Sequence, residues 1–225
     1  MRFNSKINPV PLKRLGAGYH SLDTRTKLAS ATGIRTAMAN KDNISGLLPD
    51  NCLNIIKNHT TIEYNDFSTV LGSKLLSMDT LDHIEGINQD LSNRIANNKY
   101  NFTDIETFIP MLQSKNYTYS AISRALLHII LDIKTDGLKE FISNNYVNYA
   151  MILGFNKNTG VLSEISKSTK IPLVSKFATF YKEADNNQRK MLDINLKADN
   201  LYRMIYMNKT SETFPNEFQR QIIIK

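Results

Sequence analysis

One segment, residues 118–133, restricts the fold of this chain more than any other feature of its sequence. Apolar residues recur there at every third or fourth position, which is the period of a helix with one buried face. The pattern predicts an amphipathic α-helix, and it is the strongest helical pattern in the chain. Its apolar face would consist of Ile122, Ala125, Leu126, Ile129, Ile130 and Ile133.

Similar but weaker spacing continues through most of the chain after residue 46, so we predict a mainly helical body. The sequence Thr103-x-x-Glu106 has the form of a capping box and predicts a helix that runs on to Leu112. Short apolar runs at residues 149–155 and 171–176 predict two strands on either side of a short helix. The other predicted helices cover residues 51–58, 63–78, 83–97, 160–169 and 187–207.

The first 45 residues differ from this body. Two prolines exclude a helix interior, so we predict that residues 7–15 form an extended segment before a turn that contains glycine. A helix then begins near Ser30 or Thr32, either of which can cap it. Strand, turn and capped helix make half of an α/β unit, and a lone unit cannot form a parallel sheet. We therefore expect the sequence to begin inside a domain, with Met1 an internal residue or a mis-assigned start.

The charge of the chain is unevenly distributed. It holds 28 basic and 21 acidic residues, which give a formal net charge of +7 and a pI near 9.3. Residues 1–41 contain eight basic residues against Asp23 alone. A basic segment of this kind favours a polyanionic partner that carries phosphate groups.

The composition disfavours several classes of protein. No run approaches about 18 apolar residues, and the first residues lack the apolar core of a signal peptide, so we expect a cytoplasmic protein without membrane contact. Cys52 is the single cysteine, which we expect to be a buried structural thiol. The four histidines are scattered singly and predict no metal site. Nothing in the sequence indicates a stable protein partner.

Residues 30–35, with the sequence SATGIR, are the most specific candidate for ligand binding. A small polar helix start offers free backbone N–H groups and a positive dipole end to an anion. Arg35 lies one turn inside, where its guanidinium could bind the same anion. A capped helix with a solvated arginine explains these residues equally well, and Arg14 is likewise either a surface arginine or a ligand. The sequence has no Walker loop, no G-x-G-x-x-G and no complete catalytic set, so the catalytic residues stay unassigned.

Five sequence blocks, in order along the chain, resemble a known family. KRLGAGYH at residues 13–20, with ASATGIR at residues 29–35, resembles the second half of the nucleotidyltransferase domain in tRNA(Met) cytidine acetate ligases. The second of these segments also resembles the Ser-Ser-Thr-x-x-Arg signature of the wider adenylyltransferase superfamily. The resemblance covers essentially the whole chain. The further blocks are residues 112–128, 149–155, 172–176 and 192–202.

Enzymes of this family activate acetate with ATP, as acetyl-adenylate, and then acetylate the wobble cytidine of elongator tRNA(Met). The resemblance therefore implies ATP with Mg²⁺ as cofactor, acetate as co-substrate and this tRNA as partner. It places Arg14 and Leu15 against ATP, and Ser30, Thr32 and Arg35 near the phosphates. The family's H-x-G-H motif has no counterpart in this sequence. We therefore expect the chain by itself not to bind ATP productively.

The resemblance also implies two domains and a fold that is mainly α with a small α/β part. Residues 1–45 would be the C-terminal remnant of a Rossmann-like nucleotidyltransferase domain, and residues 46–225 a mostly helical tRNA-binding domain. Cations near a helix start can contact the RNA backbone, and aromatic rings can stack on unpaired bases. Core tyrosines and solvated cations are the open alternative. The candidates are Lys115, Tyr117, Tyr119 and Arg124, together with Lys176 and Lys197.

Three functional interpretations follow. The chain is part of an ATP-dependent tRNA-modifying ligase, or a non-catalytic tRNA- or RNA-binding module, or the inactive product of a truncated gene. The first is favoured because Arg14 and residues 30–35 remain, and a pure binding module would have no use for them.

Overall fold

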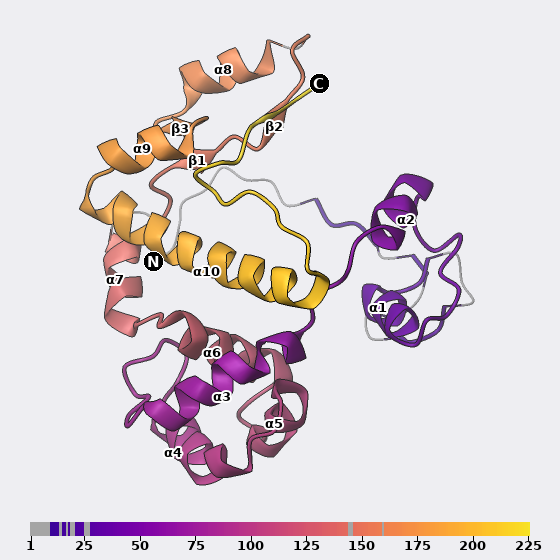
Figure 1. The fold of residues 1–225 in the computed structure, drawn as a ribbon, viewed down its shortest axis with the longest axis vertical. Helices are drawn as coiled ribbons and strands as arrows, with labels where there is room; N and C mark the ends of the chain where they lie inside the picture. Colours follow the sequence, from indigo (N-terminus) through magenta and orange to yellow (C-terminus); the bar gives the residue numbers. More distant parts are fainter. Residues whose placement is uncertain are drawn as a thin grey trace. The chain divides into compact units, whose positions relative to one another are not determined.

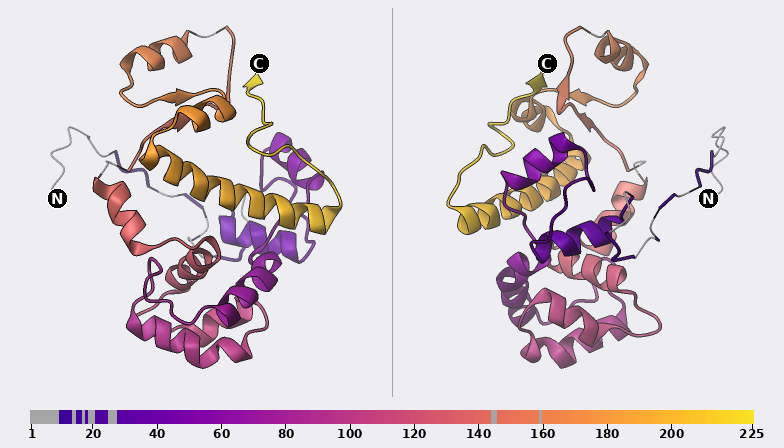
Figure 2. Two further views of the ribbon diagram at one scale, coloured as in Figure 1. Left: turned by 60° about the vertical axis from the view of Figure 1, so that its left-hand side comes forward. Right: turned by 90° about the vertical axis from the view of Figure 1, so that its right-hand side faces the viewer.

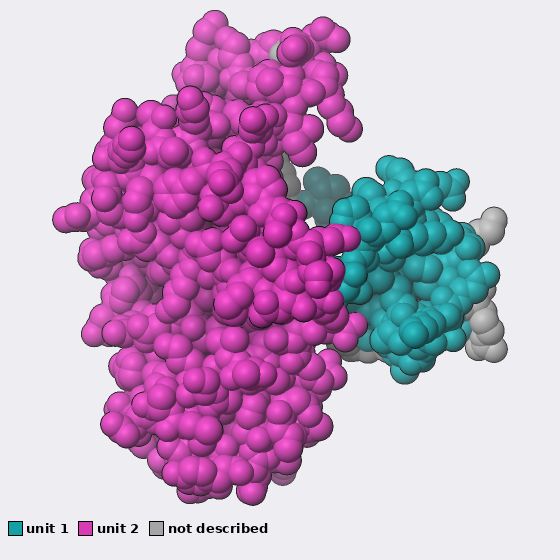
Figure 3. Space-filling model, in the orientation of Figure 1, with its two compact units in different colours: residues 1–61 teal, residues 62–225 magenta. Residues whose placement is uncertain are grey.

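In the structure, a computed structural model, the chain folds into two compact units (Figure 3). Unit 1 comprises residues 1–61 and unit 2 comprises residues 62–225. This boundary is defined by contacts within the fold. The division into a nucleotidyltransferase remnant and a tRNA-binding domain after residue 45 stays a prediction. The residues described are 10–13, 15, 16, 18, 21–24, 28–143, 146–158 and 160–225.

The described residues of unit 1 include two helices, α1 (Ala31–Ala39) and α2 (Asp50–Lys57) (Figure 1). Both were predicted, and Ser30 rather than Thr32 is the cap of α1. Gly16 has a positive φ of 92°, and a Cβ there would lie 2.5 Å from the Cβ of Leu28, so the predicted turn depends on glycine. Residues 10–13 and 15 belong to no strand, and the remainder of the predicted strand lies outside the described residues.

Unit 2 is built around α6 (Tyr119–Leu131), the helix that the sequence predicts most strongly. Five of its six predicted apolar residues are buried, and Ile133 is half-buried. Helices α3 and α5 pack directly on α6, and each fully buried aliphatic side chain contributes about 1.5–3 kcal/mol to folding. The elements of this core are η1 (Tyr64–Phe67), α3 (Ser68–Ser77), α4 (Gln89–Asn98), η2 (Lys99–Asn101), α5 (Ile105–Leu112) and α6.

Two predicted helix starts in this core were wrong. Asp104, and not Thr103, caps α5, because its carboxylate accepts a hydrogen bond from the Thr107 backbone N–H at 2.9 Å. That bond is also the main reason why the pKa of Asp104 is lowered. The helix predicted from residue 83 begins only at Gln89, since Gly86 adopts a left-handed φ of 82° that interrupts it.

The second half of unit 2 is a smaller mixed region, as the sequence predicts, although its strands are only two residues long. The strands pair in parallel: Ala150 is opposite Leu173 in one pair, and Gly154 is opposite Ile223 in the other. A Cβ on Gly154 would lie 2.7 Å from the Ile223 carbonyl oxygen, so this pairing requires glycine. The strands are β1 (Ala150–Met151), β2 (Gly154–Phe155), β3 (Leu173–Val174) and β4 (Ile223–Ile224).

Helix α10 (Asn186–Thr210) is the longest element of unit 2 and contacts α6. It runs between the helical core and the mixed region, as both Figure 1 and Figure 2 show. The helices α7 (Thr135–Ser143) and α9 (Phe177–Glu183) were not predicted, whereas α8 (Val161–Ser168) was. The fold is therefore helical with small parallel sheet parts.

Other expectations concern single residues and classes of site. Cys52 is half-buried and not fully buried, and its thiol is free. In the part of the chain that the structure describes, no helix combines the length and apolar character needed to cross a bilayer. The same residues include no group of three or more His, Cys, Asp or Glu side chains placed to hold a metal ion.

Candidate functional site

The candidate anion site in unit 1 lies at the start of α1. Ser30 is fully buried, and its hydroxyl accepts a hydrogen bond from the Gly33 N–H at 2.9 Å and donates one to the Ser21 carbonyl at 2.6 Å. A Cβ on Gly33 would lie 3.0 Å from that same carbonyl oxygen, so the loop packs closely on the helix. The Ser30 hydroxyl therefore holds the helix start in place and is already occupied by protein groups.

The other candidates of unit 1 are more accessible. Thr32 is half-buried and Arg35 is exposed, and their separation of three residues places both on one side of α1. The first turn of α1 contains no acidic residue, and the N–H groups of Ala31 and Thr32 have no partner within the helix. These groups suit an anion. Leu15 is 72% exposed, and Arg14 lies outside the described residues.

The Ser30→Ala substitution tests the structural part of this site. It removes the cap and leaves the Gly33 N–H and the Ser21 carbonyl without their partner, which costs about 1–2 kcal/mol. Hydrogen exchange of the α1 amides should accelerate by roughly 5- to 30-fold. Thr36→Ala, at an exposed position of the same helix, is the control and should leave the exchange almost unchanged. Equal exchange rates in the two variants would contradict the capping role.

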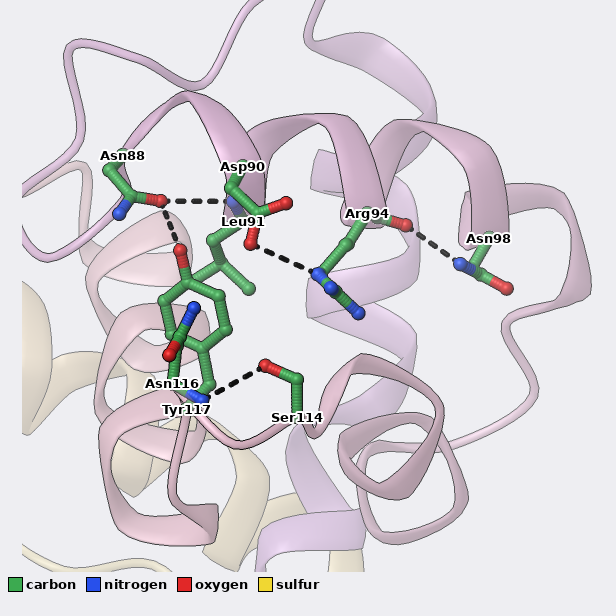
Figure 4. Close-up of polar contacts among 8 residues, drawn as sticks. All are labelled: Asn88, Asp90, Leu91, Arg94, Asn98, Ser114, Asn116 and Tyr117. Carbon is green, nitrogen blue, oxygen red and sulfur yellow. Dashed lines mark hydrogen bonds and ion pairs between the residues drawn. The ribbon is translucent and has the colours of Figure 1, made fainter.

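Tyr117, one of the four candidates near the start of α6, is held by contacts with other residues of the protein (Figure 4). Its ring packs against the hydrophobic core, and its hydroxyl donates to the Asn88 carboxamide oxygen at 2.5 Å. The same oxygen accepts a hydrogen bond from the Leu91 N–H at 3.0 Å and so caps α4. The geometry favours a structural role for Tyr117, and its contact with RNA stays a prediction.

The other three candidates at this end of α6 are exposed to solvent. Lys115 lies in the turn closed by the bridge between Ser114 and Tyr117. Tyr119 is 41% exposed, and burial of the remainder is the main reason why its pKa is raised, with Glu106 adding to the effect. The guanidinium group of Arg124 has no hydrogen bond or ion pair with any of the described residues. It is therefore free to bind an external anion.

The two remaining candidates lie elsewhere in unit 2. Lys176 is exposed immediately before α9. Lys197, on α10, donates to the Leu131 carbonyl oxygen at 2.7 Å, at the C-terminal end of α6. Because α6 has 13 residues and is about 20 Å long, Lys197 lies far from the start of that helix. The structure thus does not bring the six candidates into one cluster.

The charge balance differs between the units. Residues 1–61 contain nine basic and three acidic residues, whereas residues 62–225 contain nineteen and eighteen. Attraction of unit 2 to a polyanion must therefore come from local groups of cations. Lys74 and Lys134 lie close enough to Lys197 to lower its pKa, and sequence reasoning missed both, because more than 50 residues separate neighbouring members of the set.

Comparison with curated proteins finds relatives named tRNA(Met) cytidine acetate ligase. The protein of Caldanaerobacter subterraneus subsp. tengcongensis is 31% identical over 215 residues, which cover 92% of this chain and 52% of the relative. That of Thermoanaerobacter sp. strain X514 is 30% identical over 217 residues, which cover 93% and 53%. That of Clostridium acetobutylicum is 28% identical over 231 residues, which cover 100% and 55%. The chain spans about half the length of these relatives.

Comparison with solved structures finds the same fold in Thermotoga maritima TmcAL. Its apo form superposes with a TM-score of 0.82 at 21% identity, and the match covers 95% of this chain and 54% of that one. A second form, bound with alpha-thio ATP, gives a TM-score of 0.79 and covers 88% and 52%. A family model described as HIGH Nucleotidyl Transferase matches residues 1–217. The resemblance noted in the sequence is thus confirmed, and the chain belongs to the HIGH nucleotidyl transferase family.

Proposed function

We propose that this chain is the tRNA-holding part of a tRNA(Met) cytidine acetate ligase, which forms N4-acetylcytidine at the wobble position of elongator tRNA(Met). The observation that carries the proposal is the extent of the similarity, since relatives of that name match 92–100% of the chain. The fold of a TmcAL structure over 95% of the chain supports it. A cytoplasmic location, where tRNA is modified, is part of the same proposal.

The proposed chemistry begins with acetate and ATP. A carboxylate is a poor acyl donor, whereas acetyl-adenylate has a good leaving group that the exocyclic amine of cytosine displaces. Positive groups at the phosphates stabilise the charge that develops as pyrophosphate leaves, and each well-placed donor contributes about 3–4 kcal/mol. We propose this role for Arg14 and Arg35, and for the backbone N–H groups at Ala31 and Thr32.

The residues of unit 1 fit a nucleotide phosphate better than a metal ion. The first turn of α1 has free N–H groups and no carboxylate, and Arg35 is exposed on the same helix. These groups are donors, so they would bind phosphate oxygens. Mg²⁺, which we propose accompanies ATP, would neutralise phosphate charge. Leu15, exposed in the preceding segment, would lie against the nucleotide.

If unit 1 binds ATP and unit 2 binds tRNA, then a substitution in one unit should impair one of these activities and spare the other. Arg124→Ala removes a free, exposed cation from α6 and should weaken tRNA binding roughly 5- to 8-fold at 100 mM salt, with about one unit less salt dependence. Arg14→Ala should leave tRNA binding almost unchanged. It should instead reduce acetate-dependent ATP–pyrophosphate exchange, measured with the chain joined to a segment that carries the H-x-G-H motif.

Filter binding of an unmodified tRNA(Met) transcript measures the first effect. Lys167→Ala, which removes an exposed cation of α8, is the control and should bind as the unsubstituted chain does. Equal loss of tRNA binding in the Arg14 and Arg124 variants would overturn the division of roles. Normal tRNA binding without any pyrophosphate exchange would instead favour a non-catalytic RNA-binding module.

A further inference from the structure

Three lysines from distant parts of the sequence converge at the C-terminal end of α6. Lys197 of α10 donates to the carbonyl oxygen of Leu131, the last residue of α6. Lys134 follows that helix, with its Nζ 3.7 Å from an Asp132 carboxylate oxygen. Lys74 lies in the last turn of α3, which packs on α6. We call Lys74, Lys134 and Lys197 the lysine cluster.

The lysine cluster carries more positive than negative charge. Among the described residues, the charged groups that act on Lys197 are Lys74, Asp132 and Lys134. Around Lys197, two further ammonium groups therefore outnumber one carboxylate. Burial, and then the two other lysines, lower the pKa of Lys197, while Asp132 opposes them. A bound anion would relieve the mutual repulsion of the lysines.

The lysine cluster is also accessible to solvent, and several of its N–H hydrogen-bond donors are unused. The side chain of Lys134 is 55% exposed, Lys197 is exposed, and Lys74 is half-buried. An ammonium group has three N–H donors, and Lys197 uses one of them on Leu131. The ammonium group of Lys74 makes no hydrogen bond or ion pair with the described residues. These free donors match the several oxygens of a phosphate group.

Stabilisation of helix ends explains part of this arrangement but not the whole. A cation at the C-terminal end of a helix is favourable, which accounts for Lys197 beside α6 and for Lys74 in α3. It does not account for a third lysine beside them, because Lys134 adds repulsion. Its contact with Asp132 is long and exposed, and such pairs contribute little to stability. The excess positive charge therefore points to a ligand.

An adjoining cavity limits where that ligand can lie. The cavity has a volume of about 680 Å³, and its lining includes Asp132 and Lys134. Five carboxylates and three lysines line it, so its charge is negative overall. Two of those lysines are already paired, Lys139 with Asp136 at 3.2 Å and Lys190 with Glu140 at 2.7 Å. A phosphate would thus bind outside the cavity, on the side of Lys74 and Lys197.

The surface of α6 connects the lysine cluster with Arg124. Leu131 follows Arg124 by seven residues, so the two lie on the same face of the helix and about 10 Å apart. One RNA strand that ran along this face would meet both the arginine and the lysines. The cluster and Arg124 would then contact successive parts of the same backbone.

We infer that Lys74, Lys134 and Lys197 form a binding site for backbone phosphate of RNA. The inference rests on the proposed function, because it takes tRNA as the polyanion that unit 2 holds. The end of α6 would then contact phosphate, and the exposed aromatic ring of Tyr119 at the start of α6 would contact a base. The site fixes the position of the RNA and reads no sequence.

The double substitution Lys74→Gln with Lys134→Gln tests the site and leaves the Lys197–Leu131 hydrogen bond intact. Filter binding of an unmodified tRNA transcript to the full chain should weaken roughly 30-fold at 100 mM salt, and the salt dependence should fall by about two units. Lys167→Gln with Lys170→Gln removes the same charge from two other exposed positions of unit 2 and should bind normally. Lys74→Arg with Lys134→Arg should restore the salt dependence.

The possible results distinguish a failure of the lysine site from a failure of the proposed tRNA-binding function. If the double glutamine variant binds tRNA as its control does, the lysine site is wrong and the tRNA-binding role stands. If the unsubstituted chain retains no tRNA at any salt concentration, both are overturned. If the arginine variant binds as weakly as the glutamine variant, the lysines act through packing and not through charge, which also overturns the site.

Discussion

Replacing Phe108 by alanine should lower the free energy of unfolding of unit 2 by about 3–5 kcal/mol. The side chain is fully buried in the core formed by α3 to α6. Its ring also meets that of Phe102 edge to face, with the ring centroids 5.1 Å apart. The substitution removes this contact and leaves a cavity that neighbouring helices can fill only in part.

Urea unfolding followed by tyrosine fluorescence measures this effect. The chain has no tryptophan, and nine of its ten tyrosines lie in residues 62–225, so the signal reports mainly on unit 2. Met111→Ala, on the same helix but 47% exposed, is the control and should change the free energy by less than about 0.5 kcal/mol. A cost below about 1 kcal/mol for Phe108→Ala would show that α5 is not part of the core.

The affinity of the chain for tRNA should fall about 1,000-fold or more between 50 and 200 mM monovalent salt, if about six phosphates are contacted. Each contact releases condensed counterions from the RNA, and added salt opposes that release. Six cations of unit 2 are the expected contacts, namely Lys115, Arg124, Lys176 and the three members of the lysine cluster. Filter binding at four salt concentrations gives the slope.

A neutral osmolyte at matched osmolality serves as the control for this titration, and it should leave the affinity nearly constant. An affinity that does not change with salt would contradict any model in which lysine and arginine bind phosphate. A steep slope that persists after removal of Arg124 and the lysine cluster would locate the main contacts in residues 1–61 instead.

The sequence correctly predicts those helices in which apolar residues recur at helical spacing over several turns. Helix α6 has six buried residues, and its pattern is visible without any knowledge of its neighbours. Helix α7 has no buried residue and α9 has only seven residues, so neither produces a clear period. Ile84 and Ile87 are buried although they precede α4, which is why apolar spacing alone placed that helix start too early.

The candidate site is less predictable, because its properties depend on contacts between elements. Tyr117 and Tyr119 are nearly equivalent in the sequence, yet one is held by Asn88 and the other is exposed. The lysine cluster draws on α3, on α10 and on the segment between α6 and α7, and no spacing along the chain indicates that its members meet. By contrast, the cap of α1 depends on a local pattern, from which the sequence limits the choice to Ser30 or Thr32, and Ser30 is the cap.

The hydrogen bonds of Asn88 affect how mutational scans of this surface can be interpreted. One carboxamide oxygen serves both the first turn of α4 and the hydroxyl of Tyr117, so disturbing the phenol also disturbs a neighbouring helix. An alanine at Tyr117 that abolished tRNA retention would therefore not identify a stacking partner. Phenylalanine, which keeps the ring and loses only the hydroxyl, is the substitution that separates an aromatic contact from local unravelling.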